Sequence, residues 1–345
     1  MAITQAPRVR SDAVPLRTYR STGRAAAIAG LGVFAPEKVL TNRDLERMVD
    51  TSDQWITERT GIKERRIAEP GTPTFELATN AARAALDDAG VAAGDLDMIL
   101  VATSSPDGPF PSVACRVQAD LGIPGCCAMD ILAACSGFAY GLSLADAYIA
   151  SGRVDTILVV GAEVLSRLVD WRDRGTCVLF ADGAGAAVVR PAQAGAGFLS
   201  WCLGADGRGF DKITCGDIPR GAYAAGDARP FIGMKGPDVF KFATDIFIRQ
   251  AFAVADAAGL TMDDIDLWVP HQANRRIIEA AAQRVGLPKE RVMINIDRFG
   301  NTSTATIPLA LRDALDQDRL HAGDKVLIAG FGSGLTWAAC LLEWE

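Results

Sequence analysis

The chain has 345 residues, 49% hydrophobic and 22% charged, which is enough to bury a large core in two domains or one double-sized domain. Its formal net charge of −7 argues against a nucleic-acid-binding surface, because such a surface normally needs a net basic face. Since no uninterrupted apolar stretch is long enough to cross a bilayer, we expect a soluble, cytoplasmic protein that binds neither nucleic acid nor membranes.

The cysteine and histidine content argues against a disulfide scaffold and against a metal site. The eight cysteines are scattered, mostly inside apolar runs, and a secreted disulfide scaffold would be unusual in a chain of this length. There is no Cys-x-x-Cys pair, and the only two histidines are His271 and His321. Few ligands are therefore available. We expect no metal and no other resident cofactor.

The first residues, 1–23, are basic and polar. The segment contains four arginines and a single acid: Arg8, Arg10, Arg17, Arg20 and Asp12. This pattern could be an organelle transit peptide, but the segment is short and shows neither a secretory apolar core nor a clear amphipathic helix. We therefore expect a flexible N-terminal tail.

The first apolar segment, residues 25–36, predicts a β-strand. Gly30, Gly32 and Ala35 within it have the spacing of a dinucleotide-binding fingerprint. That fingerprint needs a helix N-terminus for the pyrophosphate, whereas Pro36 follows at once and no helix is expected there. We therefore reject dinucleotide binding. A short helix is expected over residues 41–49, followed by a polar, basic segment over residues 51–68.

An internal repeat relates the two halves of the chain. A long alanine-rich helix is expected from about Thr74 to Ala89, and a strand over residues 97–102. A second helix and strand follow in the same arrangement near residues 259–270. Equivalent positions are separated by 169 residues without a gap in three places: Gly90 and Gly259, Asp97 and Asp266, Gly161 and Gly330. We interpret the chain as a duplication.

Both halves supply helices and nearly continuous apolar strands, such as residues 157–161 and 326–330. Strands of this kind suit the centre of a sheet that is covered on both faces. Two such halves, residues 24–195 and 196–345, predict a layered αβαβα body with pseudo-twofold symmetry. Related elements of the two halves would then meet at the centre.

Cys135 is the candidate nucleophile. It lies in the run DILAACSGFAYGL, residues 130–142, where a strand is expected to give way to a buried helix. Small neighbours leave room for a substrate to reach the sulfur, and the positive end of the helix dipole is expected to lower the pKa of the thiol. The alternative is an inert buried cysteine, because cysteine often acts as a small hydrophobic residue.

The repeat places His271 and Asn301 near Cys135. Ala102, at a strand end, aligns with His271, and Asp130 aligns with Asn295, shortly before Asn301. Sites in α/β proteins assemble at such strand ends. Cys135 can take an acyl group from a thioester, while His271 and Asn301 can donate hydrogen bonds to a thioester carbonyl and stabilise an enolate. Asn301 could instead cap a helix, and His271 could be a satisfied, half-buried side chain.

A second oxyanion site is expected from main-chain N–H groups. One is the N–H of Cys135, and we expect the other to come from Ser333 in the glycine-rich turn GFGSGLTW. A strand, not a helix, is expected after this turn, so it is not a phosphate loop. Its glycines allow the backbone to approach a substrate.

Four motifs carry a family resemblance: AACSGFAYG, HQANRRII, GNTSTATIP and GFGSGLTW. In order and spacing they resemble β-ketoacyl-acyl-carrier-protein synthase III, a family of thiolase-fold condensing enzymes, from about Arg24 to the C-terminus. The resemblance implies a homodimeric acyltransferase that loads an acyl group from acyl-coenzyme A onto Cys135. It then decarboxylates malonyl-acyl-carrier-protein and forms a 3-oxoacyl-acyl-carrier-protein, initiating fatty acid or related polyketide synthesis. Coenzyme A thioester is a substrate here, not a cofactor.

The resemblance also implies binding residues. Coenzyme A would contact Trp55 and Arg174 on the two adenine faces, Arg59 at the phosphates and Asn274 at the pantetheine arm. The acyl carrier protein would dock on Gln272, Ala273, Asn274, Arg275 and Arg276, with Arg276 the main ion-pair donor, as an acidic enzyme needs a local basic patch for an acidic partner. Phe110 would cross the dimer interface to close the partner's acyl pocket, near Leu165.

Related enzyme classes fit the sequence less well. Elongating condensing enzymes use two histidines, but His321 lies in a polar turn. Degradative thiolases need a second cysteine in the glycine turn, where this chain has Ser333, and Cys340 lies well along the last strand. Plant-type polyketide synthases share the Cys-His-Asn set but are generally longer. Two alternatives stay open: a natural-product priming enzyme or acyltransferase to an oxygen or nitrogen acceptor, and a catalytically silent carrier-binding scaffold.

Overall fold

Two five-stranded sheets form the body of the protein in this computed structural model, which describes residues 14–193, 195–216 and 231–345. The N-terminal sheet has the order β2-β8-β7-β5-β6, with β7, β5 and β6 parallel. Its strands are β2 (Ala26–Phe34), β5 (Met98–Ala102), β6 (Cys127–Ile131), β7 (Ile157–Val164) and β8 (Asp182–Pro191). The C-terminal sheet has the order β1-β9-β14-β13-β12. Its strands are β1 (Arg17–Arg20), β9 (Gly197–Ala205), β12 (Leu267–Pro270), β13 (Lys325–Gly332) and β14 (Thr336–Glu343).

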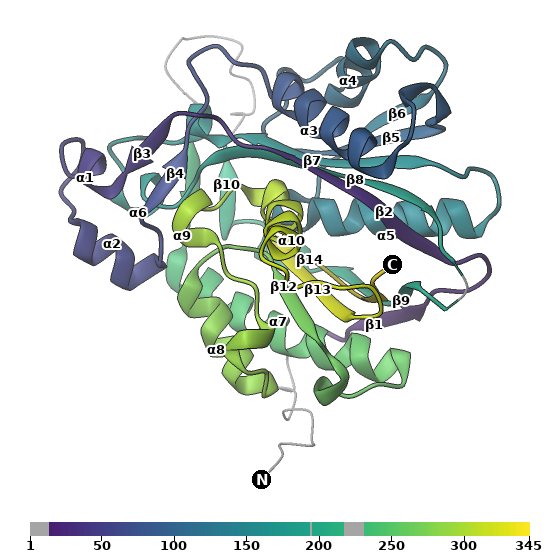
Figure 1. Ribbon diagram of the computed structural model, residues 1–345. Helices are drawn as coiled ribbons and strands as arrows, with labels where there is room; N and C mark the ends of the chain where they lie inside the picture. The colour runs from purple at the N-terminus through teal and green to yellow at the C-terminus, as the bar shows by residue number, and fades with distance from the viewer. Residues whose placement is uncertain (1–13, 194, 217–230) are drawn as a thin grey trace.

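Helices separate and cover the two sheets, giving five layers (Figure 1). The middle layer is α5 (Gly137–Ala150) and α10 (Thr306–Asp316), whose side chains share one core with strands of both sheets. Helices α3 (Thr74–Ala89) and α4 (Val113–Leu121) cover the outer face of the N-terminal sheet. Helices α7 (Gly236–Ala258) and α8 (Arg275–Val285) cover that of the C-terminal sheet. The predicted αβαβα architecture is confirmed.

The remaining elements are short. Two small antiparallel pairs are β3 (Val39–Thr41) with β4 (Glu64–Arg66) and β10 (Ile213–Cys215) with β11 (Ile232–Met234). Short α-helices are α1 (Asn42–Leu45), α2 (Asp53–Thr60), α6 (Arg174–Cys177) and α9 (Ile296–Phe299). The 3₁₀ turns are η1 (Ala93–Asp95), η2 (Ala134–Ser136), η3 (Leu165–Leu168), η4 (Gly207–Gly209), η5 (Met262–Asp264), η6 (Lys289–Arg291) and η7 (Ser303–Ala305). The helix expected over residues 41–49 occupies only Asn42–Leu45.

Helix α3 explains the glycines that resembled a dinucleotide fingerprint. A Cβ on Gly32 would lie 2.1 Å from the main-chain N of Ala85, and one on Gly30 would lie 2.6 Å from that of Ala89. These glycines therefore let the alanine-rich face of α3 pack directly onto β2. The helix ends, as predicted, where Gly90 adopts a left-handed conformation with φ 61°.

The expected flexible tail is wrong for part of its length. Residues 17–20 form β1, which pairs antiparallel with β9 from Leu203 to Ser200. Arg20 donates to the carbonyl of Ala257, and Arg249 donates to that of Val14. Helix α7 therefore holds this segment at two points, Val14 and Arg20. The amino-acid composition of the segment does not predict this main-chain pairing. Residues 1–13 lie outside the described residues.

The repeat explains four strands of each sheet but not the fifth. Strands β2, β8, β7 and β5 correspond to β9, β14, β13 and β12. The counterpart of β6 is reduced to a single parallel bridge between Trp268 and Val292. The fifth strand of the C-terminal sheet is β1, at the opposite edge. In the part of the chain that the structure describes, no helix has the length and apolarity needed to span a bilayer.

Candidate active site

The candidate nucleophile lies in a tight turn between β6 and α5. Ala134, immediately before Cys135, has φ 45°, a left-handed conformation that is rare for a residue with a side chain. On the other side, Gly332 at the end of β13 approaches so closely that a Cβ there would lie 2.6 Å from the main-chain N of Cys135. The two halves of the molecule therefore meet at the nucleophile.

Hydroxyl groups bind this turn to the glycine-rich turn after β13. The Ser136 hydroxyl donates to the carbonyl of Ala133 at 2.7 Å, and its oxygen lies 2.9 Å from the Thr336 hydroxyl. Thr336 Oγ1 is also 3.0 Å from the carbonyl oxygens of Ala133 and Ser333. The Ser333 side chain donates to the carbonyl of Ile213 at 2.6 Å. The role expected for the Ser333 main-chain N–H as an oxyanion donor stays a prediction.

The expectation of a lowered pKa at Cys135 is wrong. Burial is the main cause that raises the pKa of its thiol to about 12; the negative charge of Glu163 acts in the same direction and hydrogen bonding in the opposite one. Loss of solvation on burial destabilises the thiolate more than the positive end of the α5 dipole stabilises it. Acylation therefore has to overcome the cost of forming a thiolate in this environment.

His271 lies at the end of β12 and is 1% exposed. Its main-chain N–H donates to the carbonyl of Ala329 at 2.8 Å, and its ring packs edge-on against Phe331. The ring Nδ1 is 2.7 Å from Thr306 Oγ1. Burial lowers the pKa of His271 to about 3, so the imidazole is neutral near pH 7. Thr306 therefore contacts one ring nitrogen, whereas the other, Nε2, has no hydrogen-bond partner among the described residues.

Asn301 is held by its own backbone and by its side-chain oxygen. Its N–H donates to the carbonyl of Leu179 at 2.9 Å, and its carbonyl accepts from Ala181 at 3.0 Å. Its Oδ1 accepts from the N–H of Ser303 at 2.9 Å. This contact resembles the capping role considered for Asn301, but it also fixes the amide so that the Nδ2 donor remains for another partner.

Ser303 connects the three predicted residues. Its N–H binds Asn301, and its carbonyl lies 2.9 Å from the hydroxyl of Thr306, which in turn contacts His271. Its own hydroxyl lowers the pKa of both Cys135 and Glu163. Ser303 has φ 50°, a strained conformation that turns these groups in different directions. The structure therefore brings Cys135, His271 and Asn301 around one residue.

Sequence reasoning missed Ser303, Thr306 and Glu163. Glu163 is the one acid in the apolar stretch ILVVGAEVL of β7, and it is fully buried. An ionisable residue in such a strand is itself a signal, because buried charge is costly without a function or a partner. Ser303 and Thr306 lie in the quoted motif GNTSTATIP, but nothing in the motif shows which hydroxyl points where.

The expected adenine-binding pair, Trp55 and Arg174, is brought together. Trp55 lies on α2, and the guanidinium carbon of Arg174 is 4.8 Å from the centre of its ring. Arg174 also donates to the carbonyl of Asp50 at 2.9 Å. Because the guanidinium lies directly on the indole, a base that enters between them has to displace it. Arg59 is exposed near the C-terminal end of the same helix.

Asn274 has a structural task that the resemblance did not imply. It caps α8: its Oδ1 accepts from the N–H of Arg276 at 2.9 Å. Its Nδ2 donates to the carbonyl of Arg59 at 3.0 Å, so it joins α2 to α8. A Cβ on Gly61 would lie 2.5 Å from that of Arg275, which shows how closely these elements pack. A contact with pantetheine stays a prediction.

The predicted carrier-docking stretch is only partly on the surface. Gln272 is 1% exposed: it donates to the carbonyls of Pro270 and Met293 and accepts from the N–H of Asn295. The expectation that Gln272 contacts a carrier protein is therefore wrong, because its amide is used to join β12 to the segment before α9. Ala273 is half-buried, whereas Arg275 and Arg276 are exposed at the start of α8.

The two residues expected at the acyl pocket differ in their surroundings. Phe110 is 84% exposed in the single chain, and Leu132, directly after β6, is 81% exposed. Leu165 is 2% exposed and packs in a cluster with Ile56, Phe180 and neighbours from α2, α6 and α9. Large exposed apolar side chains beside an edge strand are typical of an interface.

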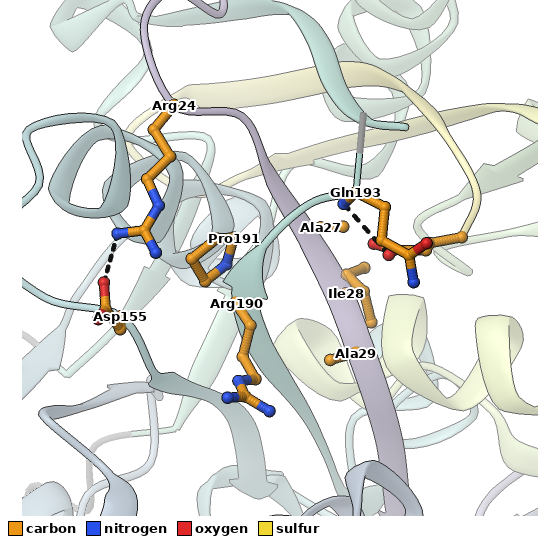
Figure 2. Close-up of a pocket in the computed structure, with 9 residues that line it drawn as sticks. Arg24, Ala27, Ile28, Ala29, Asp155, Arg190, Pro191 and Gln193 are labelled. Carbon is orange, nitrogen blue, oxygen red and sulfur yellow. Dashed lines mark hydrogen bonds and ion pairs between the residues drawn. The ribbon is translucent and has the colours of Figure 1, made fainter. Parts of the chain in front are cut away.

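A surface groove lies away from these residues and contains none of the predicted site (Figure 2). Arg24 and Asp155 form an ion pair at one side of it, and Gln193 binds Glu345 at the other. In the described ranges, no three His, Cys, Asp or Glu side chains gather as metal ligands.

The fold and the grouping of Cys135, His271 and Asn301 define a thiolase-like condensing acyltransferase. Comparison with known proteins makes this more specific. The family patterns described as 3-oxoacyl-acyl-carrier-protein synthase III and its C-terminal part match residues 129–207 and 255–344. A β-ketoacyl-acyl-carrier-protein synthase III of Geobacillus kaustophilus is 50% identical over 319 residues, which cover 92% of this chain and 99% of the relative. The chain therefore belongs to the β-ketoacyl-acyl-carrier-protein synthase III family.

Solved structures support the same family assignment. A 3-oxoacyl-acyl-carrier-protein synthase III from Aquifex aeolicus is 45% identical, with a TM-score of 0.88, and the match covers 92% of this chain and 100% of that one. A priming β-ketosynthase from the R1128 polyketide pathway is 33% identical, also with a TM-score of 0.88, over 98% of this chain and 99% of that one. The protein is an acyltransferase, and the recognition made from four motifs is confirmed.

Proposed function

We propose that this enzyme catalyses the decarboxylative condensation of an acyl-coenzyme A with malonyl-acyl-carrier-protein, giving a 3-oxoacyl-acyl-carrier-protein in the cytoplasm. The observation that carries the residue assignment is the arrangement around Ser303, which gathers a thiol and two neutral hydrogen-bond donors. A nucleophile serves the first half-reaction, and neutral donors serve the second.

In the first half-reaction, the sulfur of Cys135 attacks the thioester carbonyl of acyl-coenzyme A. The carbonyl oxygen becomes negative and is stabilised by the main-chain N–H groups of Cys135 and Ser333. Collapse of this intermediate breaks the bond to the coenzyme A sulfur and leaves an acyl group on Cys135. The leaving thiolate takes a proton and departs as coenzyme A.

In the second half-reaction, the malonyl thioester carbonyl accepts hydrogen bonds from His271 and Asn301. Loss of the β-carboxylate as carbon dioxide moves an electron pair into an enolate that these donors stabilise. The carbanion carbon then attacks the acyl carbonyl, a carbon–carbon bond forms, and the bond to Cys135 breaks. Donors that stay neutral suit this step, because the low pKa of His271 keeps it from taking a proton.

This role requires a particular tautomer of His271. To donate to the substrate, Nε2 must carry the ring proton, so Nδ1 must accept from the hydroxyl of Thr306, 2.7 Å away. The Thr306 hydroxyl has a single proton and also lies 2.9 Å from the carbonyl of Ser303. Because a carbonyl can only accept, the two contacts compete for this proton, and Nδ1 accepts from Thr306 only when the hydroxyl turns away from Ser303.

Two binding surfaces belong to the proposal. The nucleotide of coenzyme A lies by Trp55, Arg59 and Arg174, and Arg174 moves off the indole as the base enters. The acidic carrier protein docks on Arg275 and Arg276, exposed at the N-terminal end of α8, where the helix dipole adds positive potential.

We also propose a homodimer. Strand β6 is an edge strand of the N-terminal sheet, and it leaves main-chain groups without a neighbour on one side. Phe110 and Leu132 lie exposed beside it, as expected for an apolar surface that a second copy covers. Antiparallel pairing of β6 with its copy would join the two sheets and place Phe110 against the partner's acyl pocket, near Leu165.

Radiolabelled acyl-coenzyme A and malonyl-carrier-protein test the proposal. Wild-type protein should take label on Cys135, release carbon dioxide only when malonyl-carrier-protein is added, and form the 3-oxoacyl product. Cys135→Ala should take no label. Absence of label on the wild-type protein with every acyl-coenzyme A tried would contradict the function.

A second function, priming of a polyketide, is favoured by the 33% identical priming β-ketosynthase, whose match covers nearly the whole chain. It would share Cys135 and the first half-reaction. A panel of acyl primers and of carrier proteins from fatty acid and polyketide synthesis separates the two pathways. An enzyme that transfers its acyl group to oxygen or nitrogen would release no carbon dioxide in the same assay.

A further inference from the structure

The hydroxyl of Thr336 lies between the glycine-rich turn after β13 and the turn that carries Cys135. The backbone of Thr336 is fixed on both sides, because it begins β14 and pairs with Gly332 of β13 and with Ala205 of β9. Its methyl group is directed at Gly334, where a Cβ would lie 2.8 Å from Thr336 Cγ2. The other branch of the side chain, the hydroxyl, reaches the nucleophile turn. A residue of the C-terminal sheet therefore presents one hydroxyl at a fixed place between the two turns.

Three oxygen atoms surround this hydroxyl. Thr336 Oγ1 is 2.9 Å from Ser136 Oγ, 3.0 Å from the carbonyl oxygen of Ala133 and 3.0 Å from that of Ser333. Ala133 and Ser136 flank Cys135 in the chain, and the N–H of Ser136 donates to the carbonyl of Ala133 at 3.2 Å, which closes the turn around the nucleophile. The contacts of Thr336 therefore reach both sides of the nucleophile turn and the expected oxyanion residue of the other turn.

Thr336 has a single hydroxyl proton for these three oxygens. The Ser136 hydroxyl already donates to the carbonyl of Ala133 at 2.7 Å. If Thr336 donated to Ser333 within its own turn, the two hydroxyl oxygens would face each other at 2.9 Å with no proton between them, which is unfavourable. Donation to Ser136 or to Ala133 avoids this contact. Either one carries the proton of Thr336 across the gap to the nucleophile turn.

We propose that Thr336 is a positioning residue whose hydroxyl sets the distance between the two oxyanion donors, the main-chain N–H groups of Cys135 and Ser333. The inference rests on the acylation step and the oxyanion site proposed above. Both donors have to lie about 2.7–3.1 Å from the oxygen that becomes negative. The close approach of Gly332 allows the two backbones to meet but supplies no attraction. Thr336 adds a directional bond that fixes their spacing.

Other hydrogen bonds of the glycine-rich turn stay within the C-terminal half. The Ser333 hydroxyl donates to the carbonyl of Ile213 at 2.6 Å. Leu335 exchanges two main-chain hydrogen bonds with Asp206, at 2.8 and 3.0 Å. These bonds hold the turn in place without Thr336. Loss of the Thr336 hydroxyl should therefore shift the two oxyanion donors relative to each other and leave the turn itself folded.

The test replaces Thr336 by valine, which has nearly the same shape but no hydroxyl. First-turnover transfer of radiolabelled acyl groups to Cys135 is measured by rapid quench over a range of acyl-coenzyme A concentrations. The maximal rate should fall about 10- to 100-fold, as expected when oxyanion donors are displaced but not removed. The half-saturating concentration should stay within about twofold, because the oxyanion exists only beyond the bound ground state. Thr336→Ser, which keeps the hydroxyl, should restore the rate to within about threefold.

Carbon dioxide release separates positioning from a general structural defect. It is measured by adding malonyl-carrier-protein after the variant has been fully acylated. Decarboxylation depends on His271 and Asn301 in the proposed mechanism, so Thr336→Val should keep the wild-type rate within about threefold. His271→Ala should show the opposite pattern, with acylation kept and decarboxylation lost.

Two further variants locate the effect. Ser136→Ala removes the other hydroxyl but lets Thr336 donate to Ala133, 3.0 Å away, so acylation should fall less, about threefold to tenfold. Thr302→Val is the matched control, because Thr302 is fully buried and its hydroxyl has no partner among the described residues. Its acylation rate should stay within about twofold of wild type. Circular dichroism and thermal unfolding check that each variant is folded, and Thr336→Ala carries the test if Thr336→Val does not fold.

Three results would overturn the assignment. The first is a folded Thr336→Val enzyme that acylates at the wild-type rate. The second is an equal loss of acylation and decarboxylation, because Thr336 would then support the pocket in general. The third is a Ser136→Ala enzyme slower than Thr336→Val, since the bond inside the nucleophile turn would then matter more than the one across the gap. A wild-type enzyme that takes no label would instead contradict the proposed function, so the two failures are distinguishable.

Discussion

The equivalent strands β7 and β13 of the two halves carry very different residues at corresponding positions near their ends. Glu163 near the end of β7 is separated by 169 residues from Gly332 at the end of β13, the same offset that relates the rest of the repeat. One half therefore places a buried acid beside the nucleophile, and the other places a residue without a side chain against its backbone. The duplicated scaffold supplies the position, and the residue type at that position supplies the chemistry.

The two halves also contribute different kinds of side chain to the site. The N-terminal half contributes the proposed nucleophile, Cys135, and the buried acid Glu163. The C-terminal half contributes His271 and Asn301, which we propose to act as neutral hydrogen-bond donors. This separation suits a reaction that needs a nucleophile in one step and uncharged donors in the next.

Gly332→Ala should have the largest effect. A Cβ at this position would lie 2.6 Å from the main-chain N of Cys135, so the turn must move and the oxyanion site is lost. We expect acylation to fall on the order of a thousandfold, about 4 kcal/mol in the barrier. Rapid-quench labelling measures it. Gly330→Ala is the control, because its Cβ would only touch its neighbours at 3.4 Å. Equal activity of the two variants would refute the close approach.

His271→Ala should separate the two half-reactions. Self-acylation of Cys135 should continue, while decarboxylation of malonyl-carrier-protein should fall by roughly 100- to 1000-fold, the cost of losing one oxyanion donor. Acyl label on the protein and carbon dioxide release are measured on the same sample. Full decarboxylation by this variant would remove the role that we assign to His271.

Acid should weaken the fold through the same histidine. The pKa of His271 is about 3 in the folded protein and near 6.5 when unfolded, so the unfolded chain binds more protons between these values. Stability from the buried neutral ring is therefore lost as pH falls below about 6.5. His271→Gln should reduce the drop in unfolding free energy between about pH 7 and pH 4 by about 3 kcal/mol. Urea unfolding measures it, and His321→Gln, at an exposed histidine, should leave the drop unchanged.

Thr306→Val should sharpen the tautomer assignment. It removes the hydroxyl that faces Nδ1 and leaves the ring free to carry its proton on either nitrogen. We expect decarboxylation to fall about tenfold, with acylation unchanged, since about 1.4 kcal/mol separates the two ring forms in this case. Thr306→Ser, which keeps the hydroxyl, should restore the rate. A loss shared by Thr306→Ser would point to packing and not to the proton.

Arg276→Ala should have the smallest effect. The side chain is exposed and lies over Phe240, so its loss should raise the KM for malonyl-carrier-protein only about threefold to tenfold, and less at high salt. Acylation from acyl-coenzyme A should not change. The same increase in the KM for acyl-coenzyme A would place Arg276 at the nucleotide site instead. Arg284→Ala, at the other end of α8, is the control.

The sequence by itself determined the repeat, the alanine-rich helix and the apolar strands, and it predicted the site residues Cys135, His271 and Asn301. These follow from periodicity, from the spacing of short motifs and from the neighbours of each residue along the chain. Tertiary structure decided what depends on distant contacts: that Arg17–Arg20 joins a sheet, that Gln272 is buried, and that burial raises the pKa of Cys135 instead of lowering it. Glu163 and Thr304 are 141 residues apart and meet only because two sheets and two central helices pack together, and packing across such a distance leaves no local pattern in a single sequence.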